Sequence, residues 1–446
     1  MALSTSYKQI IGISIPIMLG SAAQQVITLS DSVFLFHYST IDFATIGIVS
    51  VFYLMIVAIA YGFSKGGQII IARRTGEGDR KEISRSFYNL VYFELFLAVI
   101  VFFFLRYATE YVFDWFIESP DILSGSVKYI KIRAFGVPFS FVGVAIIAFL
   151  TGVARTRFII YDTIVLLVVN VVLNYLLIFG KWGFPEMGIE GAALASAIAE
   201  VVAFSVFILY FIFSKVPRKI GMIALPKFDF ENLKQILSLS IPIVSQSVVS
   251  LGGWFLFFSF IEKYLGPRDL AVSNLVRNVY LLLIIPSWGF SSGLNTMVSH
   301  FIGNRKRMAV VPMIFKTAKL NLVFTLIFAV PVLLFPGFFL YPLFGGDNMS
   351  LITEAQPSFY VLFLILCLYS ISIIYFNGMV GVGATIYGLK VQFIGSAAYL
   401  IVVYILLSQG IGNLEMAWGS EMIYWGIMQI MCFYYLNTKR WHNLDI

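Results

Sequence analysis

Long apolar segments follow one another along almost the whole chain, and they constrain its fold more than any other feature. Each is long enough for a membrane-spanning helix, which needs about 20 apolar residues. None alternates apolar and polar residues in the manner of a barrel strand. We therefore predict an all-α integral membrane protein with twelve transmembrane helices. The expected spans are 9–36, 44–72, 87–106, 130–152, 158–180, 188–214, 235–261, 270–300, 320–342, 357–382, 388–408 and 416–437.

The composition excludes a water-soluble fold for a chain of this length. Hydrophobic residues form 60% of the 446 residues and charged residues only 12%, whereas soluble domains carry about 25% charged residues. Too few polar side chains remain to cover a globule of this size in water. The two cysteines, Cys367 and Cys432, lie in apolar segments, and the three histidines are scattered. This pattern predicts neither a disulfide framework nor a metal cluster.

Lysine and arginine are distributed unequally between the two expected sides of the membrane. With the N-terminus inside, 21 of these residues fall in inner loops or ends, seven fall outside, and Lys65 and Arg277 lie within spans. Because cytoplasmic loops are enriched in Lys and Arg, we expect both termini in the cytoplasm. The net charge of +7 then reflects topology, and no nucleic-acid partner is needed to explain it. The seven outer residues are Arg106, Lys128, Lys131, Arg133, Lys181, Lys263 and Arg268.

Two short motifs recur in the same order about 226 residues later. Ser14-Ile15-Pro16-Ile17 returns as Ser240-Ile241-Pro242-Ile243, and Gly62-Phe63-Ser64 returns as Gly289-Phe290-Ser291. This recurrence indicates an internal duplication with six spans in each half. An even number of spans makes the halves parallel, so we expect two pseudo-symmetric six-helix lobes with a substrate path between them. The predicted parts are an N-lobe over 1–214, a cytoplasmic linker over 215–234 and a C-lobe over 235–446.

Three further motifs carry a resemblance to a known family. The first span contains Pro16 and, after fourteen intervening residues, Asp31. The fifth contains Asn170-Val171-Val172-Leu173-Asn174, and the sixth opens with Gly188-Ile189-Glu190-Gly191-Ala192-Ala193. In this order, on a duplicated twelve-span frame, they resemble the multidrug and toxic compound extrusion (MATE) family of cation-coupled exporters, over essentially the whole chain.

This resemblance implies export of organic, often cationic, compounds and a Na⁺ or H⁺ site in the N-lobe, in a bacterial inner or plasma membrane. No cofactor is expected besides the coupling ion. The expected partners are small organic substrates and membrane lipid, and a monomer is expected to suffice. Some family members have acids in the seventh and tenth helices, where this chain has Ser250 and Ser370, and an aspartate in place of Asn174. These departures weigh against coupling through acids at those positions.

Asp31 is the strongest candidate for the coupling residue. A carboxylate near the bilayer centre costs about 2.5–3.5 kcal/mol on insertion scales, so its presence suggests function. Gln24 and Thr28 lie on the same helix face, and we assign both to a candidate substrate cavity. The alternative is a structural acid bonded to a neighbouring helix. The repeat counterpart of Asp31 is Phe257, which favours a single ion site in the N-lobe.

Two pairs spaced i and i+4 complete the candidate ion site. Asn170 and Asn174 present two amide oxygens on one side of the fifth span, and together with Asp31 they offer the oxygen ligands that a hard cation such as Na⁺ prefers. The alternative is that these amides only join helices by hydrogen bonds. Ser196 and Glu200 form the second pair, in the sixth span. Glu200 is either a proton carrier or a neutral acid bonded between helices.

Two residues of the second half are candidates for the substrate cavity. Aromatic residues form 17% of the chain and suit flat organic cations through stacking and cation–π contacts. Trp254 is selected because it is the repeat counterpart of Thr28. Arg277, near Asn274 and Asn278, either lines the cavity or extends outward.

These features predict a secondary antiporter that exports organic compounds in exchange for inward Na⁺ or H⁺. The alternative is a lipid-linked oligosaccharide flippase of the same superfamily, although such flippases commonly have more spans and a more basic cavity. An integral-membrane enzyme is a remote alternative, because the sequence pairs no nucleophile with a base and has no metal-ligand constellation. The sequence contains no phosphate-binding P-loop, which excludes a self-contained ATP-driven pump.

Overall fold

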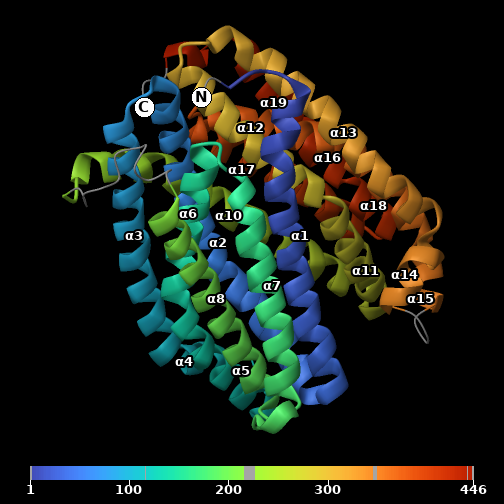
Figure 1. Ribbon diagram of the computed structural model, residues 1–446. Helices are drawn as coiled ribbons and strands as arrows, with labels where there is room; N and C mark the ends of the chain where they lie inside the picture. The colour runs from blue at the N-terminus through green and yellow to red at the C-terminus, as the bar shows by residue number, and fades with distance from the viewer. Residues whose placement is uncertain (1–2, 116, 215–226, 345–348, 439, 444–446) are drawn as a thin grey trace. The chain divides into compact units, whose positions relative to one another are not determined.

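The computed structural model describes residues 3–115, 117–214, 227–344, 349–438 and 440–443 (Figure 1). All regular structure in these ranges is helical, and ten of the helices are long and apolar enough to cross a membrane. An eleventh span arises if α11 (Pro267–Leu283) and α12 (Ile285–Gly303), which are bent by 44°, count as one. The chain is therefore an integral membrane protein of the predicted all-α class.

The helices form two compact units, each with its own core. The N-unit comprises residues 19–240, and the C-unit comprises residues 1–18 together with 241–446. The lobe limits 1–214 and 235–446 stay predictions. Of the predicted linker 215–234, residues 215–226 lie outside the part of the chain that the structure describes.

The N-unit is built around the close packing of α7 with α8 and the mutual packing of α2, α3 and α6 (Figure 1). Local signals define the helix ends: the Ser39 hydroxyl caps α2 by accepting from the Asp42 N–H, and Gly78, with φ +79°, ends the same helix. The predicted fourth span begins earlier than expected, because α5 and α6 together make one span over Pro120–Gly152. The elements are α1 (Tyr7–Tyr38), α2 (Thr40–Glu77), α3 (Arg80–Tyr107), α4 (Thr109–Asp114), α5 (Pro120–Arg133), η1 (Ala134–Gly136), α6 (Val137–Gly152), α7 (Arg157–Ile178), η2 (Lys181–Gly183) and α8 (Gly188–Phe213).

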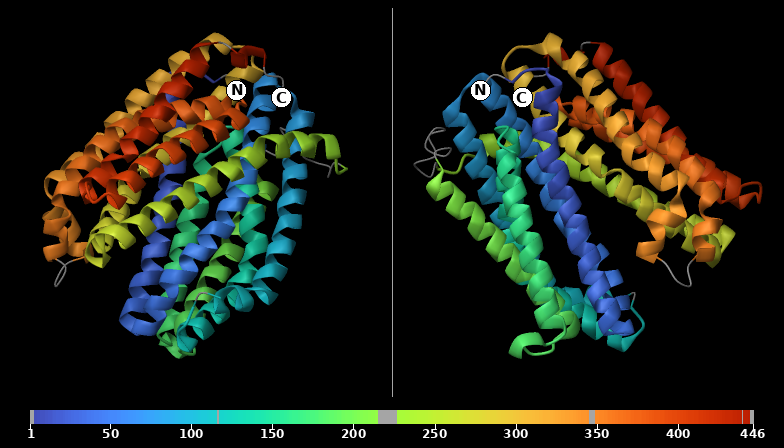
Figure 2. Two further views of the ribbon diagram at one scale, coloured as in Figure 1. Left: turned by 180° about the vertical axis from the view of Figure 1, so that it is seen from behind. Right: turned by 45° about the vertical axis from the view of Figure 1, so that its right-hand side comes forward.

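The C-unit is organised around α16, which packs against α12, α13 and α19 (Figure 2). The last predicted span, 416–437, corresponds to two helices, α18 and the 17-residue α19, joined at Ser420. The elements are α10 (Phe230–Leu265), α11, α12, η3 (Arg307–Ala309), α13 (Val310–Leu334), α14 (Pro336–Phe344), α15 (Met349–Glu354), α16 (Gln356–Gly381), α17 (Thr385–Ser408), α18 (Leu414–Gly419), α19 (Glu421–Asn437) and η4 (Arg440–Asn443).

The duplicated motifs make equivalent contacts in the two units. In the C-unit, Ser14 of α1 lies against α12: a Cβ added at Gly289 would stand 2.7 Å from the Ser14 carbonyl oxygen. In the N-unit, Ser240 of α10 lies against α2: its hydroxyl donates to the Phe63 carbonyl at 2.8 Å, and a side chain at Gly66 would overlap it. Small residues allow helices in membranes to approach this closely. The start of each half's first helix thus belongs to the unit formed mainly by the other half.

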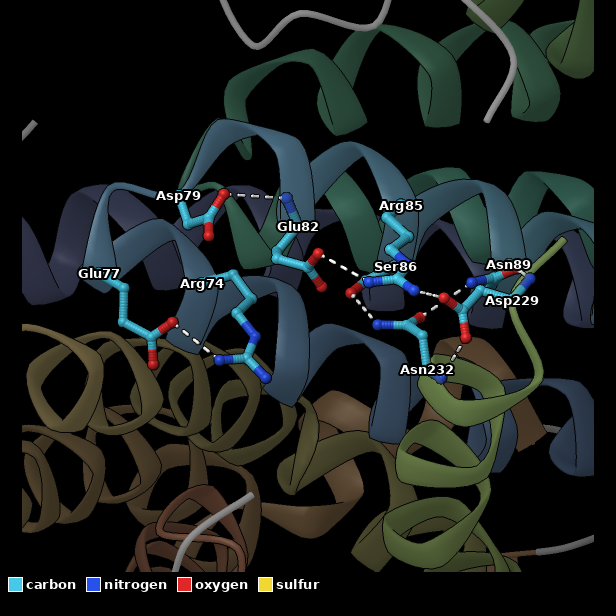
Figure 3. A network of polar contacts seen from close by, with 9 residues as sticks. All are labelled: Arg74, Glu77, Asp79, Glu82, Arg85, Ser86, Asn89, Asp229 and Asn232. Atoms are coloured by element: carbon cyan, nitrogen blue, oxygen red, sulfur yellow. Dashed lines mark hydrogen bonds and ion pairs between the residues drawn. The ribbon is translucent and has the colours of Figure 1, made fainter. Parts of the chain in front are cut away.

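A buried polar cluster fixes the start of α10 on α3 within the N-unit (Figure 3). Asp229 caps α10 by accepting from the Asn232 N–H at 3.0 Å and forms an ion pair with Arg85. The Asn89 amide donates to the Asn232 side-chain oxygen at 3.1 Å and accepts from the Asp229 N–H at 3.0 Å, while the Asn232 amide donates to Ser86. Buried polar groups need such partners, so this contact holds α10 in one register on α3.

Candidate functional site

Small residues bring α8 close to α7, and this contact positions half of the candidate site. A Cβ added at Gly191 would stand 2.7 Å from the Leu177 carbonyl oxygen, so only glycine fits there. The start of α8 is also tied to α2, because the Asp42 carboxylate accepts from the Ile189 N–H at 3.0 Å. The side chain of Ser196, farther along α8, then lies within hydrogen-bond distance of Asn170 on α7.

The structure brings four of the predicted ion-site residues into one hydrogen-bonded ring in the N-unit. The Asn174 amide donates to Oδ1 of Asp31 at 2.5 Å and to Oδ1 of Asn170 at 3.0 Å. The Asn170 amide donates to the Ser196 hydroxyl at 2.9 Å. The Ser196 hydroxyl in turn lies 3.5 Å from Oδ2 of Asp31, closing the ring. Three helices, α1, α7 and α8, therefore converge on one carboxylate.

This ring is buried and offers oxygen atoms to a small cation. Asp31 is 7% exposed and Asn174 is fully buried, and Oδ1 of Asn174 has no hydrogen-bond partner among the described residues. One carboxylate and several neutral oxygens suit Na⁺, and the carboxylate alone suits a proton. The described residues contain no group of three or more His, Cys, Asp or Glu side chains that could hold a metal ion, so a Na⁺ site here would depend on amide and hydroxyl oxygens. The role of the ring stays a prediction.

Glu200, the fifth predicted ion-site residue, makes a different contact. One turn beyond Ser196 on α8, its Oε2 lies 2.9 Å from Nη1 of Arg133, and its Oε1 accepts from the Tyr53 hydroxyl at 3.3 Å. The side chains of Arg133 and Glu200 are only 10% and 13% exposed. The prediction that Arg133 lies in an outer loop is therefore wrong: it is a buried residue at the end of α5, inside the longer fourth span.

The four candidate substrate residues lie outside this ring. Gln24 and Thr28 are exposed on α1, and the Thr28 hydroxyl donates to the Gln24 carbonyl at 3.2 Å. In the C-unit, Trp254 is half-buried and stacks on Tyr280 at a centroid distance of 5.9 Å. The Arg277 guanidinium carbon lies 5.1 Å from the ring centroid of Phe258, so this side chain makes an aromatic contact. Their proposed substrate contacts stay predictions.

The C-unit holds a buried acid that the sequence reasoning missed. Glu421, at the start of α19, is 6% exposed, and its Oε2 has no hydrogen-bond partner among the described residues. It borders a cavity of about 10 Å³ lined otherwise by Trp254, Phe257, Phe258, Tyr399 and Trp418. The sequence does contain a signal for Glu421, because this acid lies inside the last predicted span, 416–437. An acid inside a span is also the feature that selected Asp31. For Arg133, the equivalent signal was its position inside the predicted fourth span, 130–152, although it was counted with the outer residues.

The described residues thus form a set of membrane-spanning helices with a buried acid, Asp31, in the N-unit. The MatE family model matches residues 16–176 and 242–405, which together cover most of the chain. The two matches begin at the duplicated prolines, Pro16 and Pro242. The chain belongs to the MatE family of membrane transporters.

Curated relatives and solved structures agree with this assignment. The chain is 28% identical over 331 residues to "Probable multidrug resistance protein NorM" of Thermotoga maritima, covering 74% of this chain and 70% of the relative. It is 25% identical over 369 residues to the protein of the same name from Photorhabdus laumondii, covering 81% and 78%. An outward-facing multidrug resistance MATE family transporter of the MOP superfamily superposes with a TM-score of 0.89 at 20% identity, covering 97% and 95% of the two chains. The likeness confirms the predicted fold of twelve transmembrane helices in two lobes.

Proposed function

We propose that this protein is a secondary antiporter that exports organic, often cationic, compounds in exchange for inward Na⁺ or H⁺. The observation that carries the proposal is the ring of Asp31, Asn170, Asn174 and Ser196, in which one buried carboxylate is held by three neutral side chains. A buried membrane acid of this kind marks an ion path in transport proteins. The names of the relatives from Thermotoga maritima and Photorhabdus laumondii, both multidrug resistance proteins, support the substrate class.

Transport by purified protein in lipid vesicles tests this function. A Na⁺ gradient and a proton gradient are imposed separately, and movement of ethidium, a flat organic cation, is followed by fluorescence. We expect uphill ethidium movement with at least one of the two gradients and none without a gradient. Vesicles that hold less than one copy on average test the expectation that a monomer suffices. Ethidium movement that is equal with and without both gradients would refute antiport.

We further propose that both termini face the cytoplasm of a bacterial inner or plasma membrane, because inner segments hold 21 of the 30 Lys and Arg residues. Gly78, which ends α2, is then inside, and Gly183, between α7 and α8, is outside. Epitope tags inserted after Gly78 and after Gly183 check this in intact cells, with permeabilised cells as the control. Only the Gly183 tag should bind an external antibody. External labelling of the Gly78 tag would reverse the orientation. Asp347, another predicted outer position, lies outside the described residues.

A further inference from the structure

Arg133 and Glu200 form a buried ion pair that the proposed coupling step does not explain. Both sit inside the membrane-spanning part of the N-unit, Arg133 at the end of α5 and Glu200 in the middle of α8. An ion pair in this setting is weak evidence for stability, because burying both charges costs about as much as their attraction returns. Charged side chains within membrane helices are instead associated with ion pathways.

The surroundings hold the pair in one arrangement. The Arg133 guanidinium lies over the Tyr53 ring, 4.1 Å from its centroid, and the Tyr53 hydroxyl donates to Glu200. A Cβ added at Gly136 would overlap Oε2 of Glu200, so the absent side chain at this position makes room for the carboxylate. Each oxygen of Glu200 thus has a fixed neighbour, Tyr53 at Oε1 and Arg133 at Oε2. This arrangement leaves Glu200 poorly placed to exchange a coupling ion.

The pair is also linked to the Asp31 ring. Ser196 hydrogen-bonds within the ring and precedes Glu200 by four residues, so both side chains lie on the same face of α8. Nη1 of Arg133 lies 2.9 Å from Glu200, which places its charge about one helical turn from the ring. Because a guanidinium stays protonated in proteins, its charge is permanent. With both acids ionised, Asp31, Glu200 and Arg133 together carry one net negative charge.

We propose that Arg133 is a built-in counter-charge that limits the coupling site to one monovalent cation per transport cycle, with Glu200 acting as a positioning residue for its guanidinium. The inference rests on the proposed antiport at Asp31. In this arrangement the cation neutralises Asp31, while Glu200 keeps Arg133 from occupying that carboxylate itself. Removal of Glu200 would free the guanidinium to pair with Asp31. Removal of Arg133 would leave two negative charges for incoming cations.

Charge-changing variants test the proposal in ethidium transport vesicles, where the half-saturating cation level and the number of cations per ethidium are measured. The cation is whichever of Na⁺ or H⁺ drives the parent protein. Glu200→Gln should weaken apparent cation affinity by about tenfold or more. Arg133→Gln should strengthen the apparent cation affinity and raise the number of cations per ethidium above the parental value. The double variant Arg133→Gln/Glu200→Gln restores one net negative charge and should return affinity to within about threefold of the parent.

Two control variants distinguish the effect of charge on transport from a loss of folding. Arg133→Lys keeps the positive charge and should keep the parental number of cations per ethidium. Glu94→Gln changes another buried acid of the N-unit, which accepts a hydrogen bond from Ser64. This variant should leave both the cation affinity and the number of cations per ethidium unchanged. If the single variants do not fold, the double variant still tests the proposal, because it removes both members of the ion pair and leaves Asp31 with its one negative charge. A folded double variant whose cation affinity differs from the parent by more than about threefold, or whose number of cations per ethidium differs from the parental number, would overturn the counter-charge role. Parental gradient-driven transport by Asp31→Asn would instead refute the proposed antiport, so the two failures are distinguishable.

Discussion

Replacing Asp31 with asparagine should reduce gradient-driven export to the level of protein-free vesicles. The substitution keeps the size of the side chain and an oxygen that can accept from Asn174. It removes the only charge in the hydrogen-bonded ring, so neither Na⁺ nor a proton has a carboxylate to bind. Cation and substrate affect each other through a coupling free energy that is the same in both directions. Losing the cation site should therefore also abolish the effect of the gradient on ethidium binding.

Two measurements distinguish the loss of coupling from a loss of folding or of substrate binding. The Asp31→Asn protein should match the parent in expression and in melting temperature in detergent, because the neutral ring can still form its hydrogen bonds. Its ethidium affinity should become independent of Na⁺ and pH, whereas the affinity of the parent should depend on the coupling ion. Well-folded Asp31→Asn protein that exports ethidium at the parental rate would exclude this residue from coupling.

Replacing Asn174 with alanine should distinguish the two possible coupling ions. The side-chain oxygen of Asn174 is fully buried and has no hydrogen-bond partner in the described part of the chain, which leaves it available as a ligand. If the ion is Na⁺, losing a buried polar partner of this kind costs about 1–3 kcal/mol, which is roughly a 5- to 150-fold loss of apparent affinity. If the ion is H⁺, the carboxylate of Asp31 still binds it and the change should be small.

The matched control is Asn437→Ala at the end of α19, where the exposed amide donates to the Phe433 carbonyl of its own helix. This variant should show the parental dependence on either ion. Asn170→Ala should follow Asn174→Ala in direction, because Asn170 connects Asn174 to Ser196. A sodium-driven protein whose Na⁺ affinity is unchanged in both Asn170→Ala and Asn174→Ala would restrict these amides to joining helices.

Local patterns in the sequence were sufficient to predict the helices and the members of the Asp31 ring. Apolar runs report burial in lipid or protein directly, and an i, i+4 spacing places Asn170 and Asn174 on one helix face whatever the tertiary structure. The convergence of α1, α7 and α8 on Asp31 depends on contacts between distant segments. It was predicted from the chemistry of one carboxylate with two amide oxygens, together with the family resemblance, because residue spacing alone does not place distant helices side by side.

Three features of the structure were not predicted from the sequence: the burial of Arg133, the bend between α11 and α12, and the buried acid Glu421. Arg133 was counted with the outer residues because a charge near the start of a span normally marks its end at the membrane surface. The contact with Glu200, which is distant in the sequence, shows that this charge is buried and paired. The bend between α11 and α12 was missed because the apolar run continues through it. Glu421 was overlooked because its neighbours in space come from α10, α17 and α18 rather than from its own helix.

The exchanged helix starts imply that neither half is a self-sufficient folding piece. A fragment that stops before α10 would lack the segment around Ser240 that fills the groove at Gly66, and a fragment that begins at α10 would lack Ser14 at Gly289. Two separately expressed halves should therefore recover stability only when they are produced together. Reciprocal exchange of an identical element is how domain-swapped dimers form. Here the same reciprocal exchange is made within one polypeptide, so each half completes the core of the other half's unit.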